Sequence, residues 1–143
     1  MAKIKNDRAT WHAQRVVNGE IEAGLLHRLA CERHLRDLKR QNTEDFPFHW
    51  DVEASNRIID FAETLTIAEG EEPKEVTLYE HQAFDLGSLM GWKNQEGYRR
   101  FRRSYISMAR QNGKTFFNGI LGTYIALLGG YNHGKLFTVA TKK

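Results

Sequence analysis

One run of seven residues constrains the fold of this chain more than any other feature. The run is Ala109-Arg110-Gln111-Asn112-Gly113-Lys114-Thr115, and it lies between an apolar segment at residues 105–108 and a longer one at residues 116–128. Gly-Lys-Thr between a strand and a helix is the second half of a phosphate-binding loop. The pattern therefore predicts a strand, an anion-binding loop and a helix in succession.

Each residue of the Gly-Lys-Thr tripeptide has a role in binding phosphate. Backbone N–H groups of a tight loop, together with the positive end of the following helix, form a cradle for an anion. Gly113 lets the backbone approach the phosphates, Lys114 is expected to reach the β- and γ-oxygens, and the Thr115 hydroxyl is expected to ligate Mg²⁺. Met108 occupies the position where the usual pattern begins with glycine, so an ordinary turn is the alternative interpretation.

The residues around the loop predict the front of an α/β nucleotide-binding unit. We expect a strand at residues 102–108, a helix at residues 114–128, a glycine-rich exit at residues 129–134 and a second strand at residues 136–140. Strands joined by a helix in this way belong to a parallel sheet. The predicted fold class is therefore α/β, a truncated P-loop fold preceded by a small helical subdomain.

The first half of the chain predicts that helical subdomain. Residues 1–18 show no sustained period and are expected to form an arm with little structure of its own. Helical periodicity covers residues 23–40 and residues 51–65, and Asp51 is a suitable N-cap for the second helix. Residues 41–50 are expected to form a loop.

The boundary between two domains is expected near residue 75. Residues 68–74 contain Gly and Pro and predict an exposed linker. Thr77 and Glu80 have the spacing of a capping box, which predicts that the next helix begins there. We therefore expect an arm and helical subdomain over residues 1–75 and the start of a P-loop domain over residues 76–143.

Composition excludes few classes of protein. The chain has 143 residues, a formal net charge of +3 and one cysteine, Cys31, so neither an internal disulfide nor a cysteine metal cluster is expected and a reducing cytosol fits. No apolar run is long enough to cross a membrane, and the first residues do not form a signal peptide. The mild basicity permits contact with nucleic acid without establishing it.

The loop also carries a resemblance to a known family. Ala/Ser-Arg-x-x-Gly-Lys-Thr, with an arginine inside the loop, resembles the P-loop of the terminase large subunit of tailed bacteriophages. Three other segments are similar to that family in the same order. They are residues 23–38, which resemble its amino-terminal helix, residues 78–82 with Gly91-Trp92, which resemble its adenine-site segment, and residues 135–141, which resemble the strand after its P-loop helix.

The resemblance implies a function and a set of partners. Proteins of this family are ATPase motors that drive double-stranded viral DNA into a procapsid and carry a nuclease domain as well. It implies ATP and Mg²⁺ as cofactors, and the portal and the small terminase subunit as partners of the full-length protein. It further implies a homo-oligomeric ring on the portal, no membrane association, and location in the host cytoplasm.

The resemblance also assigns roles to two residues beyond the Gly-Lys-Thr tripeptide. Arg110 would sense or stabilise the γ-phosphate, and we expect it to share a catalytic role with Lys114; its alternative is an ordinary ion pair. Gln82 would read the adenine edge, with Tyr79 one turn earlier as a stacking partner; its alternative is an exposed helix surface. The remaining loop residues are expected to contribute to the nucleotide site through the backbone.

One part of a complete ATPase is not found in this sequence. Phosphoryl transfer also needs an apolar strand that ends in an acidic pair, and no such strand follows Thr115. The nearest match, Asp60 and Glu63, precedes the loop and has helical spacing. We therefore expect the chain to be the front of the motor, cut before its catalytic acid and its nuclease, and inactive in ATP hydrolysis by itself.

Two further groups of residues have a structural and a functional interpretation. His34 and Cys31 have the spacing of a metal pair on a helix, but no further ligands are near them in sequence, so a structural role is favoured. A basic cluster interleaved with aromatic residues fits DNA contact, contact with a neighbouring subunit, or the wet face of a strand. Its members are Arg99, Arg100, Arg102 and Arg103, with Tyr98, Phe101 and Tyr105.

Two alternatives to the terminase interpretation stay open. One is another P-loop NTPase, such as a helicase-like protein or a small-molecule kinase. The other is a non-enzymatic helical module that binds DNA or a protein partner and contains Gly-Lys-Thr by chance. A dependence of nucleotide binding on Lys114 separates the second alternative from the others.

Overall fold

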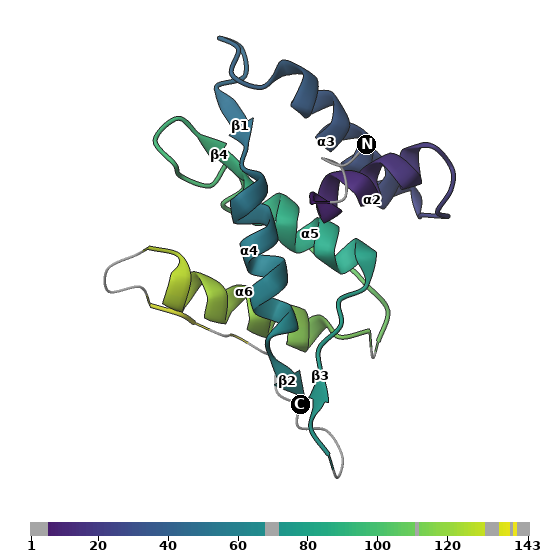
Figure 1. The fold of residues 1–143 in the computed structure, drawn as a ribbon, viewed down its shortest axis with the longest axis vertical. Helices are drawn as coiled ribbons and strands as arrows, with labels where there is room; N and C mark the ends of the chain where they lie inside the picture. The colour runs from purple at the N-terminus through teal and green to yellow at the C-terminus, as the bar shows by residue number, and fades with distance from the viewer. Residues whose placement is uncertain (1–5, 68–71, 111, 131–134, 138, 140–143) are drawn as a thin grey trace. The chain divides into compact units, whose positions relative to one another are not determined.

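A computed structural model describes residues 6–67, 72–110, 112–130, 135–137 and 139 (Figure 1). They fall into two compact units, Met1–Tyr105 and Ile106–Lys143. The first unit contains helices α2 to α5 and four short strands, and the described part of the second unit contains helix α6. The helices are α2 (Arg8–Val17), α3 (Leu25–Arg40), α4 (Val52–Glu63), α5 (Glu80–Gly91) and α6 (Lys114–Leu128).

Helix packing forms the core of the first unit. Helix α5 packs against α4 and α2, and α2 also packs against α3. Gly87 marks a close approach between these helices, because a Cβ atom there would lie 2.5 Å from Ser55 Oγ and 3.1 Å from Ala9 Cβ. Small residues at such crossings let backbones approach and bring the larger apolar side chains into contact.

Two antiparallel ribbons complete the first unit. Strand β1 (Phe48–Trp50) pairs with β4 (Trp92–Asn94), with His49 opposite Lys93. Strand β2 (Thr66–Ile67) pairs with β3 (Lys74–Glu75). The observed elements are mixed helix and strand, in agreement with the α/β class, but the sheets among the described residues are two-stranded and antiparallel.

Three of the predicted helices are confirmed. Helix α6 covers residues 114–128 as predicted, and α3 ends at Arg40. Asp51 is the N-cap of α4, and its Oδ1 accepts a hydrogen bond from the N–H of Ala54 at 2.9 Å. Asp60 and Glu63, the nearest match to a catalytic acidic pair, both lie on α4, as their helical spacing predicted.

The prediction for residues 1–18 is wrong, because α2 forms within them. Asp7 caps this helix by accepting from the N–H of Thr10 at 3.0 Å, and Ala9, Ala13 and Val16 are fully buried. Alanines give a weak hydrophobic signal in sequence, yet they provide the close packing surface of a helix. The buried face of α2 therefore gives little hydrophobic signal in the sequence.

The predicted strand at residues 102–108 is not formed. A strand obtains its backbone hydrogen bonds from a neighbouring strand, and the described part of the second unit contains none. The described members of the second predicted strand, residues 136, 137 and 139, are also outside any strand, while residues 138 and 140 lie outside the described part. The loop predicted at residues 41–50 ends in strand β1.

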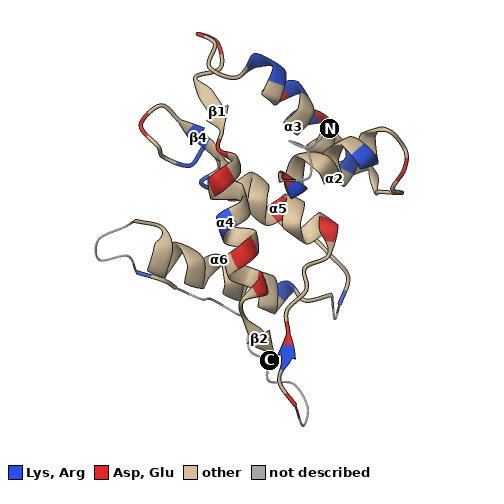
Figure 2. Cartoon of the chain, viewed as in Figure 1, with Lys and Arg blue, Asp and Glu red and all other residues tan. Residues whose placement is uncertain are grey.

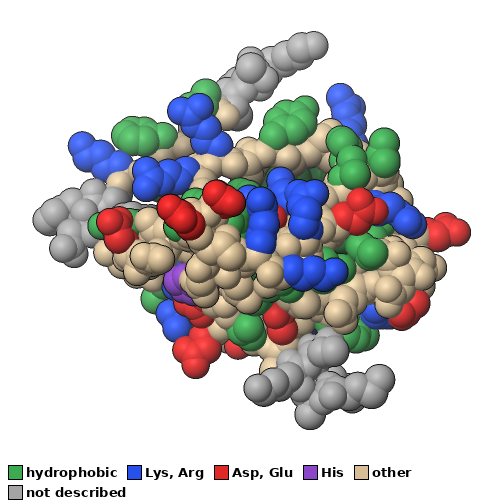
Figure 3. Space-filling model, turned by 90° about the horizontal axis from the view of Figure 1, so that it is seen from above, with side chains coloured by type: hydrophobic (Ala, Val, Ile, Leu, Met, Phe, Trp, Pro, Cys, Tyr) green, Lys and Arg blue, Asp and Glu red, His purple; other side chains and the backbone are tan. Residues whose placement is uncertain are grey.

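Charged and apolar side chains alternate on the surface. Figure 2 shows basic residues along α3, whose last turn contains Lys39 and Arg40. On the face drawn in Figure 3, hydrophobic, basic and acidic side chains lie among one another. None of the helices among the described residues is long and apolar enough to cross a membrane.

Candidate phosphate-binding site

The loop before α6 ends in a left-handed glycine at the start of the helix. Gly113 is the N-cap of α6 and adopts the left-handed conformation, with φ 75° and ψ 19°. A side chain is strongly disfavoured in this conformation, which explains the glycine. The first helical hydrogen bond runs from Phe117 N–H to Gly113 O at 2.8 Å, so the N–H groups before Phe117 have no intrahelical partner.

No side chain caps the start of α6. The N-cap is a glycine, and no side-chain hydrogen bond closes the first turn. The unpaired N–H groups and the helix dipole therefore favour an anion at this end. Gly113, Lys114 and Thr115 are all exposed, so the turn is accessible to a ligand.

Lys114 folds back over the loop. Its Nζ donates a hydrogen bond of 2.7 Å to the carbonyl oxygen of Met108, six residues earlier. An ammonium carries three donors, so this bond leaves two of them for a ligand. The contact also draws a positive charge away from the helix N-terminus, where it is disfavoured, and holds it beside the loop.

The remaining loop residues are exposed where they are described. Ala109, Arg110 and Asn112 are exposed, and Gln111 lies outside the described residues. Arg110 makes no ion pair with another described residue, in contrast to the structural alternative considered for it. Its guanidinium is thus available to an anionic ligand.

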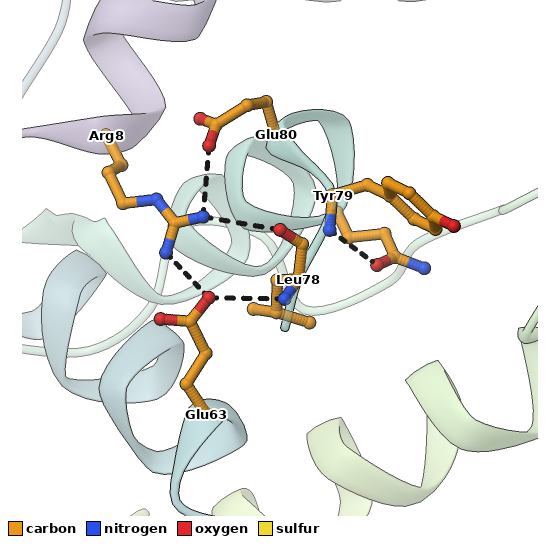
Figure 4. A network of polar contacts seen from close by, with 6 residues as sticks. Arg8, Glu63, Leu78, Tyr79 and Glu80 are labelled. Atoms are coloured by element: carbon orange, nitrogen blue, oxygen red, sulfur yellow. Dashed lines mark hydrogen bonds and ion pairs between the residues drawn. The ribbon is translucent and has the colours of Figure 1, made fainter. Parts of the chain in front are cut away.

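Gln82, the predicted adenine-reading residue, lies on α5 in the first unit. Its Oε1 accepts a hydrogen bond from the N–H of Tyr79 at 3.1 Å, so it caps the helix two residues after the predicted capping box (Figure 4). The side chain is buried, while the Tyr79 ring is 70% exposed and stacks on His81 with centroids 5.8 Å apart. The carboxamide is therefore held in one orientation, with its NH₂ group left to donate.

A polar network fixes the segment that leads into α5. Arg8 donates to Glu63 Oε1 at 2.9 Å and to Glu80 Oε1 at 3.1 Å, and Glu63 Oε1 also accepts from the N–H of Leu78 at 3.2 Å (Figure 4). Sequence reasoning missed Arg8, because its partners are more than fifty residues away. Glu80 is thereby an ion-pair partner of Arg8 rather than the capping residue that the sequence predicted.

The basic cluster divides into a buried and an exposed part. Arg100 Nη1 forms a 2.6 Å ion pair with Asp37 Oδ2, and its guanidinium lies over the Phe46 ring at 4.6 Å. Arg100 therefore has a structural role inside the first unit. Arg102 and Arg103 are exposed, as DNA contact or subunit contact would require.

His34 has the structural role expected for it. Its Nδ1 accepts from Trp92 Nε1 at 3.1 Å, and its Nε2 lies 2.9 Å from Thr10 Oγ1. Burial lowers the pKa of His34 to about 4, so the ring is neutral near pH 7. Both ring nitrogens are occupied by these contacts, which supports a structural role for His34.

Comparison with known proteins supplies the family. Residues 80–143 match the family of the terminase large subunit, ATPase domain. This range begins at α5 and contains Gln82, the loop and α6. No curated protein and no solved structure matches the chain. The resemblance found in the sequence is confirmed over residues 80–143, which are similar to the ATPase domain of the terminase large subunit.

Proposed function

We propose that residues 109–115 bind the phosphates of ATP together with Mg²⁺, as the nucleotide site of a DNA-packaging motor. The observation that carries this proposal is the folded-back Lys114 beside a left-handed Gly113 at the start of α6. That geometry combines backbone N–H donors, a helix dipole and an ammonium around one exposed turn. The family match over residues 80–143 supports it independently.

The donor set of the loop suits a nucleotide triphosphate. Backbone N–H groups and Lys114 would hold the phosphates, the Thr115 hydroxyl would ligate Mg²⁺, and Arg110 would contact the γ-phosphate. Asn112 and Ala109 would contribute backbone atoms, and so would Gln111. Bound Mg²⁺ would neutralise charge on the phosphate oxygens, and Gln82 would read the N6/N7 edge of adenine through its carboxamide, which can both donate and accept.

The wider assembly follows from the family. We infer that in the full-length protein ATP hydrolysis is coupled to packaging of double-stranded viral DNA through the portal, with the small terminase subunit as a partner. A homo-oligomeric ring and location in the host cytoplasm belong to the same proposal. So does a parallel P-loop sheet, in which residues 102–108 and 136–140 would gain neighbouring strands, with the domain boundary near residue 75.

Calorimetry of the Lys114→Ala variant tests the nucleotide site. Lys114→Ala should weaken binding of MgATP to the chain by about 10- to 100-fold, the range for loss of a charge-assisted hydrogen bond of about 1.5–3 kcal/mol. Lys135→Ala is a matched control, because it removes one exposed lysine from the same unit. Equal affinities of wild type and Lys114→Ala would contradict the assignment, and so would an equal loss in Lys135→Ala.

A further inference from the structure

Three potential metal ligands meet where α2 and α3 pack together. They are His12 on α2 and His27 and Cys31 on α3, and their ligand atoms all lie within 4.8 Å of one another. His12 Nε2 lies 2.9 Å from His27 Nε2. His12 and Cys31 are buried and His27 is half-buried, so the group lies inside the first unit and away from the phosphate-binding loop in sequence.

We propose that His12, His27 and Cys31 bind a divalent, thiolate-preferring cation, with Zn²⁺ as the natural occupant. Two imidazoles and one thiolate are a donor set that Zn²⁺ favours, and the fourth position would take water. His27 and Cys31 are four residues apart on one helix, which places both side chains on one face. The third ligand, His12, comes from the neighbouring helix.

The spacing of the two histidines requires only a small adjustment. Zn–N distances of about 2.0–2.1 Å and tetrahedral angles place two ligand nitrogens about 3.3 Å apart. The observed separation of 2.9 Å is therefore about 0.4 Å too short, and small side-chain rotations would provide the difference. The cation would replace the hydrogen bond that the two rings share.

Asp85 on α5 supplies an outer partner for His27. Its Oδ1 lies 4.0 Å from His27 Nδ1, the ring nitrogen opposite the one that faces His12. A carboxylate behind a metal-bound imidazole fixes the ring and raises its basicity. The Cys31 thiolate would also balance one of the two charges of the cation inside a poorly hydrated region.

Burial acts differently on the imidazoles and on the thiol of the three ligands. Burial, followed by the nearby His27, lowers the pKa of His12 to about 4, and burial also lowers the pKa of His27. Both imidazoles are thus neutral near pH 7 and keep a lone pair for a cation. Chiefly because of burial, the pKa of Cys31 is raised to about 12, so binding would release the thiol proton to solvent.

The cluster also contains one buried polar atom, His12 Nδ1, without a hydrogen-bond partner among the described residues. This nitrogen is opposite the Nε2 that would bind the cation, so metal binding would leave it unpaired. As a ligand set, the same residues would join α2 to α3 directly, and to α5 through Asp85, and would stabilise the first unit against unfolding.

Cobalt binding by the metal-free chain tests the site. Co²⁺ added to the chelator-treated 143-residue chain should produce a thiolate-to-cobalt charge-transfer band at a 1:1 ratio, and Zn²⁺ should displace it. Cys31→Ala should abolish the band while keeping an apolar side chain at this buried position. His27→Ala should weaken Co²⁺ binding more than tenfold, whereas His49→Ala, on strand β1, should not change it.

Thermal unfolding provides a second readout. Zn²⁺ should raise the unfolding midpoint of the wild type and leave that of Cys31→Ala unchanged. Circular dichroism of both metal-free proteins must show the same helix content, so that the comparison concerns binding and not folding. No band at tenfold excess of Co²⁺, or a band of equal intensity in Cys31→Ala, would overturn the proposal.

Discussion

The ion pair between Asp37 and Arg100 gives the sharpest prediction about stability. The Asp37 side chain is 1% exposed and that of Arg100 is 17% exposed, with 2.6 Å between Oδ2 and Nη1. Arg40 donates to the other carboxylate oxygen at 2.8 Å but is 46% exposed. The variant Asp37→Asn keeps the shape of the side chain and removes its charge, leaving the Arg100 guanidinium buried without a carboxylate.

Loss of one partner from a buried pair costs about 3–5 kcal/mol. We expect Asp37→Asn to lie near 3 kcal/mol, because Arg100 keeps its contact with the Phe46 ring and with neighbouring aromatic rings. Small domains are stable by about 5–15 kcal/mol, so this loss is a large fraction of the total. Urea unfolding at pH 7 measures it.

Two comparison variants separate the buried pair from general charge effects. Arg36→Ala removes a cation that is 66% exposed and 3.9 Å from Asp37, and should cost less than about 0.5 kcal/mol. The double variant Asp37→Leu/Arg100→Met should lose less than Asp37→Asn, because no unpaired charge remains buried. A loss below about 1 kcal/mol for Asp37→Asn would refute the reasoning.

The same pair predicts a dependence on pH. Burial by itself would raise the pKa of Asp37, but hydrogen bonds from Arg100 and Arg40 and their charges outweigh it, so the pKa lies below its ordinary value. A depressed folded-state pKa stabilises the protein fully above the unfolded-state value of about 4, and this stability is lost as pH falls through the folded-state pKa. The difference between wild type and Asp37→Asn should therefore shrink below pH 4.

Two further predictions concern the adenine site and helix packing. Gln82→Ala removes both the donor and the acceptor of the carboxamide, so it should reduce the preference for ATP over GTP by about 1–3 kcal/mol in calorimetry; an unchanged ratio would return Gln82 to a purely structural role. Gly87→Ala should destabilise the chain by about 1–3 kcal/mol in urea, because the added Cβ meets Ser55 Oγ and Ala9 Cβ. A gain in stability, as helix propensity alone predicts, would show that the helices can move apart.

Local sequence signals predicted the elements that depend on neighbouring residues. Asp51 caps α4 through a bond to a residue three positions later, and α6 follows from the apolar run after Gly113. The family was also readable, because the loop motif is contiguous. These features need no information from distant parts of the chain.

The tertiary structure decided what depends on residues far apart in sequence. Arg8 bonds to Glu63 and Glu80, and Arg100 bonds to Asp37, across separations of 55 to 72 residues. These basic residues therefore have structural roles, although the sequence alone allows them to bind a ligand. The helix α2 formed because other helices bury its alanines.

The candidate metal ligands show the same division. On α3, sequence reasoning weighed Cys31 with His34, three residues later, whereas folding brings Cys31 together with His27 and with His12 from α2. Helical spacing alone allows Cys31 to pair with His27 or with His34. The direction from which α2 packs places His12 beside His27 and Cys31. The strand predicted at residues 102–108 is not formed for a similar reason. Its residues favour a strand, but a strand needs a hydrogen-bonding neighbour, which a local sequence pattern does not supply.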